Sequence, residues 1–286
     1  MKTSLRLIAD SGSTKTDWAL LSTEGPATIV KTQGINPFHQ DEAAICAVLT
    51  EELLPQLPPH VLADLQSLTS LSIHFYGSGV RPELEAKMER LLREVFPHAS
   101  SVEAHSDMLG AARALCGGSE GIACILGTGA NSCLYDGEQI VENTPALGYI
   151  LGDEGSGAVL GVRFLNALYK GRLPVTILRD FDAQLGLTMA DVISRVYRQP
   201  MPNRWLASLS PFIHQYINIG VVRQLVVDNF RDFIRRNIAP YGRPDLPLSA
   251  VGSIAYYYRE QLAEAAQAEG YALGRILRSP LDAMCD

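Results

Sequence analysis

Two segments of the sequence share one pattern, in which an apolar strand, a glycine-containing turn and a second strand follow one another. Residues of the segment 122–135 lie 117 positions after their counterparts in the segment 5–18. A short match of this kind also arises by chance. As a repeat, it predicts two halves with one plan, each of which contains a β-hairpin. The coincident pairs are Ile8 with Ile125, Gly12 with Gly129, Thr14 with Asn131, and Trp18 with Tyr135.

The size and charge of the chain limit its class. Its 286 residues are 47% hydrophobic, which is enough for two domains with separate cores. A net charge of -7 and the lack of a basic run argue against nucleic acid as a partner. Apolar stretches such as 122–126 are far shorter than the roughly 20 residues that cross a bilayer. The N-terminus lacks a signal-peptide pattern, so we expect a cytoplasmic protein without membrane contact.

Short strands alternate with helices in the first half, and the region 152–237 is largely helical after its first turn. Asp41 is expected to open a helix, and the turn 77–79 joins a strand to a further helix. A short strand ends at Asp107, and residues 248–251 form the last expected strand. The pattern indicates an α/β fold.

The cysteines are scattered and form no C-x-x-C pair. This spacing argues against a zinc site and against a disulfide framework. We interpret them as small buried hydrophobic side chains. They are Cys46, Cys116, Cys124, Cys133 and Cys285.

Four glycine-containing turns are candidates for binding a polyphosphate, because glycine lets backbone N–H groups converge. None matches the Walker A loop or the G-x-G-x-x-G of dinucleotide-binding folds. Two opposed hairpin tips, one from each half, could instead clamp the phosphates. In the first tip, Gly12, Ser13 and Thr14 can donate hydrogen bonds, and Lys15 can reach phosphate oxygens. The four turns are 10–17, 127–131, 152–157 and Gly252-Ser253.

Asp10 lies beside the first of these turns. A carboxylate next to a triphosphate usually acts through Mg2+, which keeps several waters and takes one or two protein carboxylates. The alternative is that Asp10 only caps the turn, since aspartate is common in turns. Asp10 is therefore a candidate magnesium ligand.

Asp107 ends a strand and begins a helix. An ordinary N-cap would account for this position. The functional alternative is a general base that removes a hydroxyl proton as a phosphoryl group arrives, which contributes about 100-fold to 10,000-fold in rate. The position of Asp107 directly before the second half favours the general base.

Six segments in one order carry a resemblance that runs nearly from end to end of the chain. The strongest are Gly-Thr-Gly-x-Asn at 127–131 and Gly-Asp-Glu-Gly-Ser at 152–156. The others are 10–17, Gly34-Ile35-Asn36-Pro37, Asp107 with the small-residue helix after it, and 251–254. Together they resemble the N-acetylglucosamine kinase and benzoyl-CoA reductase ATPase-subunit family. That family lies within the superfamily of actin, sugar kinases and heat-shock chaperone ATPases.

The resemblance implies two ribonuclease-H-like (actin-like ATPase) domains with a central cleft. The first would comprise residues 1–106, completed by a C-terminal helix at 271–286, and the second residues 107–270. It also implies ATP and Mg2+ as cofactors, with Asp10 supporting the metal. The implied nucleotide-binding residues are Asp10, Gly12, Ser13, Thr14, Lys15, Gly127, Thr128, Gly129, Gly252 and Ser253.

The same resemblance implies ATP-dependent phosphorylation of an amino sugar, with N-acetylglucosamine as the leading substrate and Asp107 as the catalytic base for its 6-hydroxyl. Two departures concern the acetamido pocket: Leu147 stands where the animal kinases carry tryptophan, and Pro37-Phe38 also differs. Glucosamine and N-acetylmuramic acid stay open as substrates, because one pocket substituent shifts preference by only about 1 to 3 kcal/mol. The implied sugar-binding residues are Asn36, Ser78, Asp107, Asn131, Ala146, Leu147, Gly148 and Asp153.

Two other functions stay open. An ATPase that activates a dehydratase or reductase would hold an iron–sulfur cluster with cysteine thiolates, but the segment 152–156 contains no cysteine. A nucleotide-switched or sugar-binding regulatory module would bind without rapid transfer, since fold does not fix function. The sequence allows a homodimer but does not indicate one.

Overall fold

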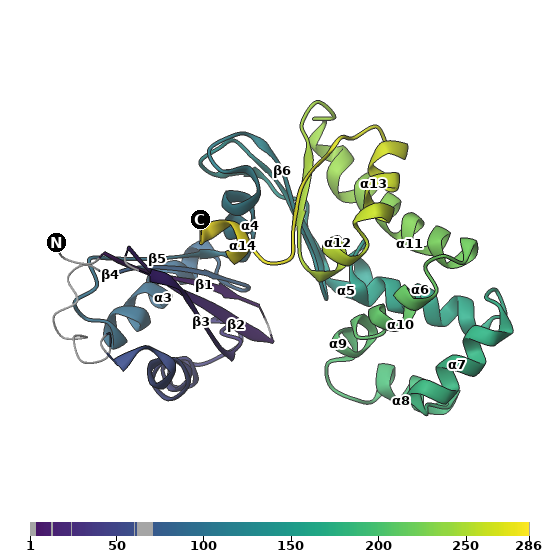
Figure 1. Ribbon diagram of the computed structural model, residues 1–286, viewed down its shortest axis with the longest axis horizontal. Helices are drawn as coiled ribbons and strands as arrows, with labels where there is room; N and C mark the ends of the chain where they lie inside the picture. The colour runs from purple at the N-terminus through teal and green to yellow at the C-terminus, as the bar shows by residue number, and fades with distance from the viewer. Residues whose placement is uncertain (1–3, 13, 24, 60, 62–70, 286) are drawn as a thin grey trace. The chain divides into compact units, whose positions relative to one another are not determined.

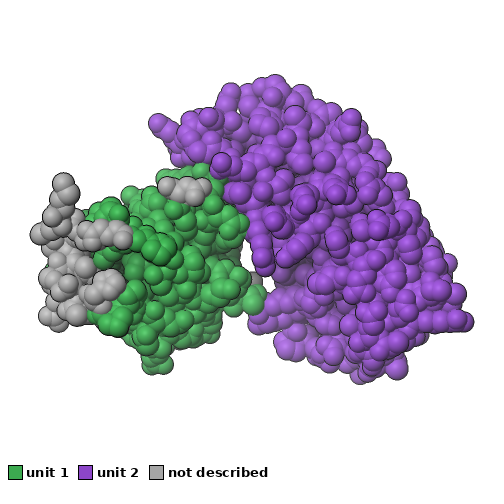
Figure 2. All heavy atoms as spheres, viewed as in Figure 1, with its two compact units in different colours: residues 1–114, 279–286 green, residues 115–278 purple. Residues whose placement is uncertain are grey.

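The computed structural model describes residues 4–12, 14–23, 25–59, 61 and 71–285 (Figure 1). The chain forms two compact units (Figure 2), of which the first comprises Met1–Ala114 and Ser279–Asp286 and the second Leu115–Arg278. The expected division lies after residue 106, with a return at residue 271. The observed division comes later in both places, within the helix that begins at Asp107 and after the last strand.

The first unit is built on a five-stranded sheet with the order β3-β2-β1-β4-β5. The central strand, β1, pairs antiparallel with β2 and parallel with β4. The outer pairs continue this arrangement on each side: β2–β3 is antiparallel and β4–β5 is parallel. The strands are β1 (Leu5–Ser11), β2 (Lys15–Ser22), β3 (Gly25–Gln33), β4 (Leu71–Gly77) and β5 (Ser101–Ser106).

Apolar side chains of this sheet and its helices form the first core. Trp18 and Phe75 are fully buried, with ring centroids 5.9 Å apart, and the Trp18 indole N–H donates to Thr32 Oγ1 at 3.0 Å. Asp41 opens α1 as expected, because its Oδ1 accepts the Ala44 N–H at 2.8 Å. The helical segments are α1 (Glu42–Ala47), a π-helical turn (Val48–Leu53), a 3-10 turn (Leu54–Gln56), α3 (Pro82–Val95), α4 (Asp107–Cys116) and α14 (Leu281–Met284).

The second unit repeats this plan, with the strand order β10-β9-β6-β7-β8. Here β6 is central, antiparallel to β7 and parallel to β9. The predicted repeat is therefore confirmed as a shared strand topology. The strands are β6 (Gly121–Leu126), β7 (Ala130–Tyr135), β8 (Ile140–Glu142), β9 (Leu248–Val251) and β10 (Leu273–Leu277).

The two hairpins do not match at the constant spacing expected from the sequence. By strand ends, Gly12 corresponds to Gly127 rather than to Gly129. The turns also close differently, since the Gly12 N–H donates to the Lys15 carbonyl, whereas the Gly127 N–H donates to the Gly129 carbonyl, each at 3.0 Å. The closing hydrogen bond of the second turn spans one residue fewer, but three residues separate the strands in each hairpin, so the repeat aligns without a gap once the offset is changed.

Helices fill most of the region between β8 and β9, as the pattern of 152–237 predicted. Side chains of α6 and α11 pack with those of β6 in one apolar cluster. The helices are α5 (Gly148–Leu151), α6 (Gly157–Tyr169), α7 (Val175–Leu185), α8 (Met189–Tyr197), α9 (Pro202–Ala207), α10 (Ser210–Gln215) and α11 (Gly220–Phe233). They are followed by a π-helical turn (Ile234–Ile238), a 3-10 turn (Ala239–Tyr241), α12 (Ser253–Tyr257) and α13 (Arg259–Ala268).

The C-terminal segment differs from the expected helix at 271–286. Its first part forms β10, parallel to β9, so β9 is not the last strand. This pairing satisfies backbone groups of β9: the Leu248 N–H donates to the Ala272 carbonyl at 2.8 Å, and the Gly252 N–H to the Leu277 carbonyl at 3.1 Å. Only the short α14 is helical, and it packs against β1.

The cysteines are free, and Cys46, Cys116 and Cys285 are only partly buried, which differs from the prediction of buried side chains. Cys124 and Cys133 are fully buried in the second sheet, as predicted. Burial raises the pKa of both thiols, which keeps them unreactive. Among the helices of the described residues, none has the length and hydropathy to span a bilayer.

Replacing Trp18 by leucine should lower the free energy of unfolding by about 3 kcal/mol, because a fully buried ring and the donor to Thr32 are lost. Trp205→Leu is the control, since Trp205 is only partly buried, and should cost about 1 kcal/mol or less. Urea denaturation followed by circular dichroism measures both losses. Equal losses would contradict the role assigned to Trp18.

Candidate functional site

One buried hydroxyl joins the end of β1 to the loop after β3. Ser11 Oγ accepts the Ile35 N–H at 3.0 Å and lies 3.0 Å from the Ile35 carbonyl and 2.7 Å from Thr16 Oγ1. The Ser78 N–H donates to the Ser11 carbonyl at 2.8 Å, which ties the turn after β4 to the same point. Side chains that follow these strands therefore meet at one edge of the sheet, where ligands bind in open α/β sheets.

Asn36 and Ser78, both expected to bind the sugar, are brought together at this edge. Gly79 has a φ of 82°, and a side chain there would overlap the Asn36 amide oxygen, so glycine allows the close approach. The Ser78 Oγ is buried and has no hydrogen-bond partner among the residues that the structure describes. Buried hydroxyls are almost always paired, so a ligand hydroxyl would fit here.

Three carboxylates gather at the same edge. Asp10 faces Asp17 across the β1–β2 pair, and Asp17 forms an ion pair with Lys15. Burial raises the pKa of Asp10 to about 7, and the charges of Asp107 and Asp17 add to the rise. Ser279 Oγ, 3.4 Å from Asp10 Oδ2, acts in the opposite direction. Neighbouring donors and cations thus do not offset the burial of this negative charge.

Asp107 stands at the start of α4, directly after β5. The N-cap interaction belongs to Ser106, whose Oγ accepts the Leu109 N–H at 3.2 Å, so capping does not account for Asp107. Burial raises the pKa of Asp107 to about 6, although the N–H groups of Met108 and of Asp107 itself lower it. A carboxylate with such a pKa is mostly ionised at neutral pH and able to accept a proton.

The acidic edge fits a magnesium ion. Asp17 Oδ1 is buried without a hydrogen-bond partner among the described side chains, and the pKa of Asp10 is raised to about 7 by burial and by nearby carboxylates. A dication would offset both costs. Within the described ranges no cluster of three or more His, Cys, Asp or Glu could hold a metal, but Mg2+ needs only one or two carboxylates with water and phosphate.

The first glycine turn is described only in part, because Ser13 lies outside the described residues. The Gly34 N–H donates to the Thr14 carbonyl at 3.2 Å, which ties the turn to the Asn36 loop. The Lys15 ammonium, expected to reach phosphate oxygens, is paired with Asp17. Contact with a phosphate would require Lys15 to leave Asp17 or to share it.

The second glycine turn lies on the N-terminus of α6. The Gly127 carbonyl accepts the Gly157 N–H at 2.8 Å, and the Thr128 carbonyl accepts the Ala158 N–H at 3.2 Å. Asp153 lies beside this turn, because the Ala130 N–H is hydrogen-bonded to its carboxylate and holds its pKa down. Burial is the larger effect and raises the pKa of Asp153 to about 6.

Backbone strain marks the segment next to Asp153. Leu147 and Asp153 have φ values of 64° and 53°, a region that side-chain-bearing residues rarely occupy. The Asp153 N–H donates to the Ala146 carbonyl at 2.9 Å, so the backbone at Ala146, directly before Leu147 and Gly148, lies beside Asp153. Their role in sugar binding stays a prediction. Leu147 is 65% exposed, which leaves its side chain free to contact a ligand.

Asn131 and Gly252 lie at the same end of the second sheet. Asn131 Oδ1 accepts from Asn143 Nδ2 at 2.9 Å, so Asn143, which we did not predict, orients it. Gly252 has a φ of 120°, and any side chain there would overlap the Leu126 carbonyl. This glycine and Ser253, the first residue of α12, therefore sit against the end of β6.

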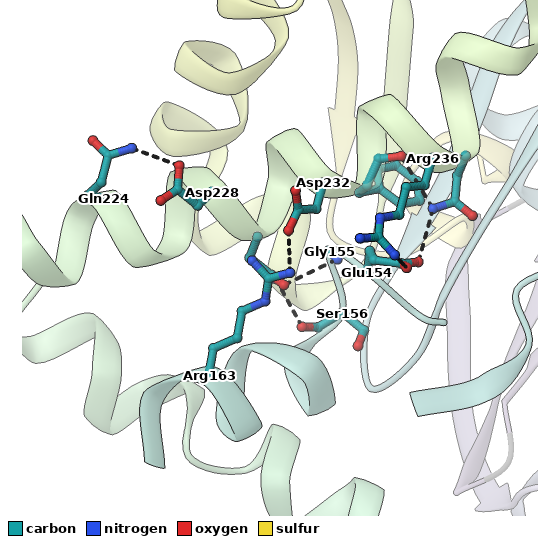
Figure 3. Close-up of polar contacts among 11 residues, drawn as sticks. Glu154, Gly155, Ser156, Arg163, Gln224, Asp228, Asp232 and Arg236 are labelled. Carbon is teal, nitrogen blue, oxygen red and sulfur yellow. Dashed lines mark hydrogen bonds and ion pairs between the residues drawn. The ribbon is translucent and has the colours of Figure 1, made fainter. Parts of the chain in front are cut away.

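A residue that sequence reasoning missed holds the Gly-Asp-Glu-Gly-Ser loop in place; Figure 3 shows Glu154, Gly155 and Ser156 of this loop. Asn229 of α11 is fully buried; its Oδ1 accepts the Gly155 N–H at 3.4 Å, and its Nδ2 donates to the Ser156 carbonyl at 3.3 Å. Arg236 pairs with Glu154 in the same loop at 3.2 Å. The signal was a lone asparagine on the apolar face of an amphipathic helix, a position that costs stability unless its amide is satisfied.

The raised pKa of Asp10 predicts how the unliganded protein responds to pH. A carboxyl group with a raised folded pKa does not oppose folding below its unfolded pKa, near 4, and destabilises the fold as pH rises through about 7. Asp10→Asn removes this charge, so it should be more stable than the parent protein at pH 8 by on the order of 2 kcal/mol. Near pH 4 the difference should vanish. Thermal unfolding without nucleotide or metal measures the difference in stability between the variant and the parent protein. A difference that does not change with pH would contradict the raised pKa of Asp10.

Comparisons with known proteins agree with this geometry. No protein-family model matches the sequence, and no curated protein matches it. Among solved structures, the chain is 48% identical to a candidate N-acetylglucosamine kinase from Porphyromonas gingivalis, over 98% of this chain and 96% of that chain, with a TM-score of 0.91. A candidate N-acetylglucosamine kinase from Chromobacterium violaceum is 20% identical over 99% of this chain and 98% of that chain, with a TM-score of 0.71.

A ROK-family glucokinase from Streptomyces griseus, solved with glucose and AMPPNP, is 15% identical over 97% of this chain and 95% of that chain, with a TM-score of 0.52. At these low identities, the glucokinase and the Chromobacterium protein show only the fold of this chain. It is the two-domain actin-like ATPase fold that the sequence predicted. The Porphyromonas protein shares nearly half of its residues along almost the whole chain. The chain therefore belongs to the N-acetylglucosamine kinase family of the actin-like ATPase superfamily.

Proposed function

We propose that this protein transfers the γ-phosphoryl group of ATP to the 6-hydroxyl of an amino sugar, with N-acetylglucosamine as the leading substrate. The observation that carries the proposal is the half-buried Asp107, which is freed from capping by Ser106 and has a pKa raised to about 6. The 48% identity to a candidate N-acetylglucosamine kinase supports the sugar.

Asp107 acts as the general base in this proposal. Its carboxylate accepts the proton of the sugar hydroxyl while that oxygen forms a bond to the γ-phosphorus and the bond from phosphorus to the ADP oxygen breaks. The turns that contain Thr14 and Thr128 position the phosphates, and Gly252-Ser253 lies by the adenosine.

Asp10 and Asp17 would hold Mg2+. Bound there, the ion would offset charge on the phosphates and on the carboxylates that the fold has buried. Asp10 would be the main ligand of the ion, and the Asp17 Oδ1, which is unpaired among the described residues, would be available as a second ligand. Lys15 is positioned by its ion pair with Asp17.

The sugar would be held by polar groups from both units. Asn36 and Ser78 belong to the first, and the unpaired Ser78 Oγ suits a sugar hydroxyl. Asn131, Asp153 and the backbone at 146–148 belong to the second. The use of ATP favours a cytoplasmic location in this proposal.

Asp107→Asn should reduce kcat with the amino sugar by about 100-fold to 10,000-fold, because the amide cannot accept the hydroxyl proton. ATP affinity should change little, since Asp107 does not contact the nucleotide in this proposal. A coupled assay of ADP release over a hexosamine panel measures the first quantity, and titration calorimetry with an ATP analogue measures the second. An unchanged kcat would remove Asp107 from the mechanism.

The activity of the parent enzyme should also depend on pH in a defined direction. Because Asp107 must be ionised to act as a base, kcat/KM should fall as pH decreases through about 6. Asp107→Glu keeps a carboxyl group and should retain an acidic limb, whereas the residual rate of Asp107→Asn should lack the limb that belongs to residue 107. If the asparagine variant showed the same fall in kcat/KM at acidic pH, the fall would belong to another titrating group.

A further inference from the structure

Arg81, close in sequence to the predicted sugar residue Ser78, lies over an aromatic ring of the first unit. The guanidinium carbon of Arg81 lies 4.2 Å from the centroid of the Phe38 ring. The His39 ring packs edge-on against the same ring, with the two ring centroids 4.9 Å apart. Phe38 is 51% exposed. The ring therefore limits the positions of the guanidinium without covering it, and a cation–π contact of this kind stabilises the arrangement.

Arg81 has no acidic partner within ion-pair distance among the residues that the structure describes. Arg90 on α3, the helix that Arg81 directly precedes, shows the contrasting case, since it pairs with Glu42 and Glu94 at 2.6 Å each. An arginine fork offers up to five N–H donors in a fixed geometry that matches a carboxylate or a phosphate. Arg81 thus presents a preoriented cation whose hydrogen bonds are available to a ligand.

The backbone connects this cation to the predicted sugar residues. The Phe38 N–H donates to Asn36 Oδ1 at 3.0 Å, and the Asn36 amide lies against Gly79. Arg81 follows Gly79 by two residues. Ser78, whose Oγ is unpaired among the described residues, directly precedes Gly79. Arg81, Phe38, Asn36 and Ser78 therefore form one continuous cluster, called here the Arg81 cluster.

We propose that Arg81, oriented by Phe38, binds a negatively charged substituent of an amino sugar and so extends the substrate range from N-acetylglucosamine to anionic hexosamines. This inference rests on the proposed function, because Asn36 and Ser78 bring the sugar to the Arg81 cluster. A carboxylate and a phosphate share the required chemistry. The neutral parent sugar would bind without using Arg81.

Calorimetric titration without ATP tests the inference. The probes are N-acetylglucosamine, N-acetylmuramic acid with a carboxylate on its C3 substituent, and N-acetylglucosamine 1-phosphate. Arg81→Gln should weaken binding of at least one anionic probe by about 10-fold to 100-fold, as expected for a charge-assisted hydrogen bond, and change binding of N-acetylglucosamine less than about 2-fold. The probe that is affected identifies the carboxylate or the phosphate. Loss of neither, or equal loss for neutral and anionic sugars, overturns the inference.

Matched variants separate this effect from general charge loss. Arg93→Gln removes the same charge from an exposed site near the other end of α3 and should leave all three affinities unchanged. Phe38→Leu should weaken binding of the same anionic probe, and adding it to Arg81→Gln should cause little further loss, since the ring acts through the guanidinium. An equal loss in the Arg93 variant, or full additivity of the double variant, would count against the Arg81 cluster.

The two proposals fail separately. Release of ADP with N-acetylglucosamine reports the kinase function and does not require Arg81. Binding of an anionic probe that depends on Arg81 would support the specificity site even if no transfer occurred. Active phosphorylation of N-acetylglucosamine together with no binding of either anionic probe would overturn the specificity site and leave the kinase intact.

Discussion

Both units depend on a central strand that is hydrogen-bonded to an antiparallel partner on one side and a parallel partner on the other. The antiparallel partner, β2 or β7, places a hairpin turn at the carboxyl end of the central strand. The parallel partner, β4 or β9, brings its own carboxyl end to the same edge. This pairing gathers Asp10 and Ser78 in one unit, and the turn 127–129 and Gly252 in the other, although these residues are far apart in the sequence.

The same pairing imposes costs at the site. Asp10, Asp107 and Asp153 are partly removed from water, and the pKa of each is raised. Asp17 Oδ1 and Ser78 Oγ are buried without partners among the described residues. Such departures from local rules are typical of functional sites, and the apolar core of each unit supplies the stability that offsets them.

Supporting residues were the hardest to foresee. Ser106 relieves Asp107 of the capping role through a hydrogen bond to the Leu109 N–H, yet a serine and an aspartate in sequence are equally good caps. Asn229 holds the 152–156 loop from more than seventy residues away in the chain. Nothing local distinguishes such contacts, because their meaning depends on which helix packs beside which loop.

The sequence by itself determined the strands of both hairpins, the glycine turns, the helical region 157–237 and the acidic residues that could carry chemistry, because periodicity, glycine and charge act locally. The tertiary structure decided the rest. It turned residues 273–277 into an edge strand rather than a helix, since the backbone of β9 required a partner. It also shifted the repeat so that Gly12 corresponds to Gly127, because the ends of two strands depend on how they pair. Likewise, burial and neighbouring carboxylates set the pKa values of Asp10 and Asp107, and neither effect exists until distant segments have packed together.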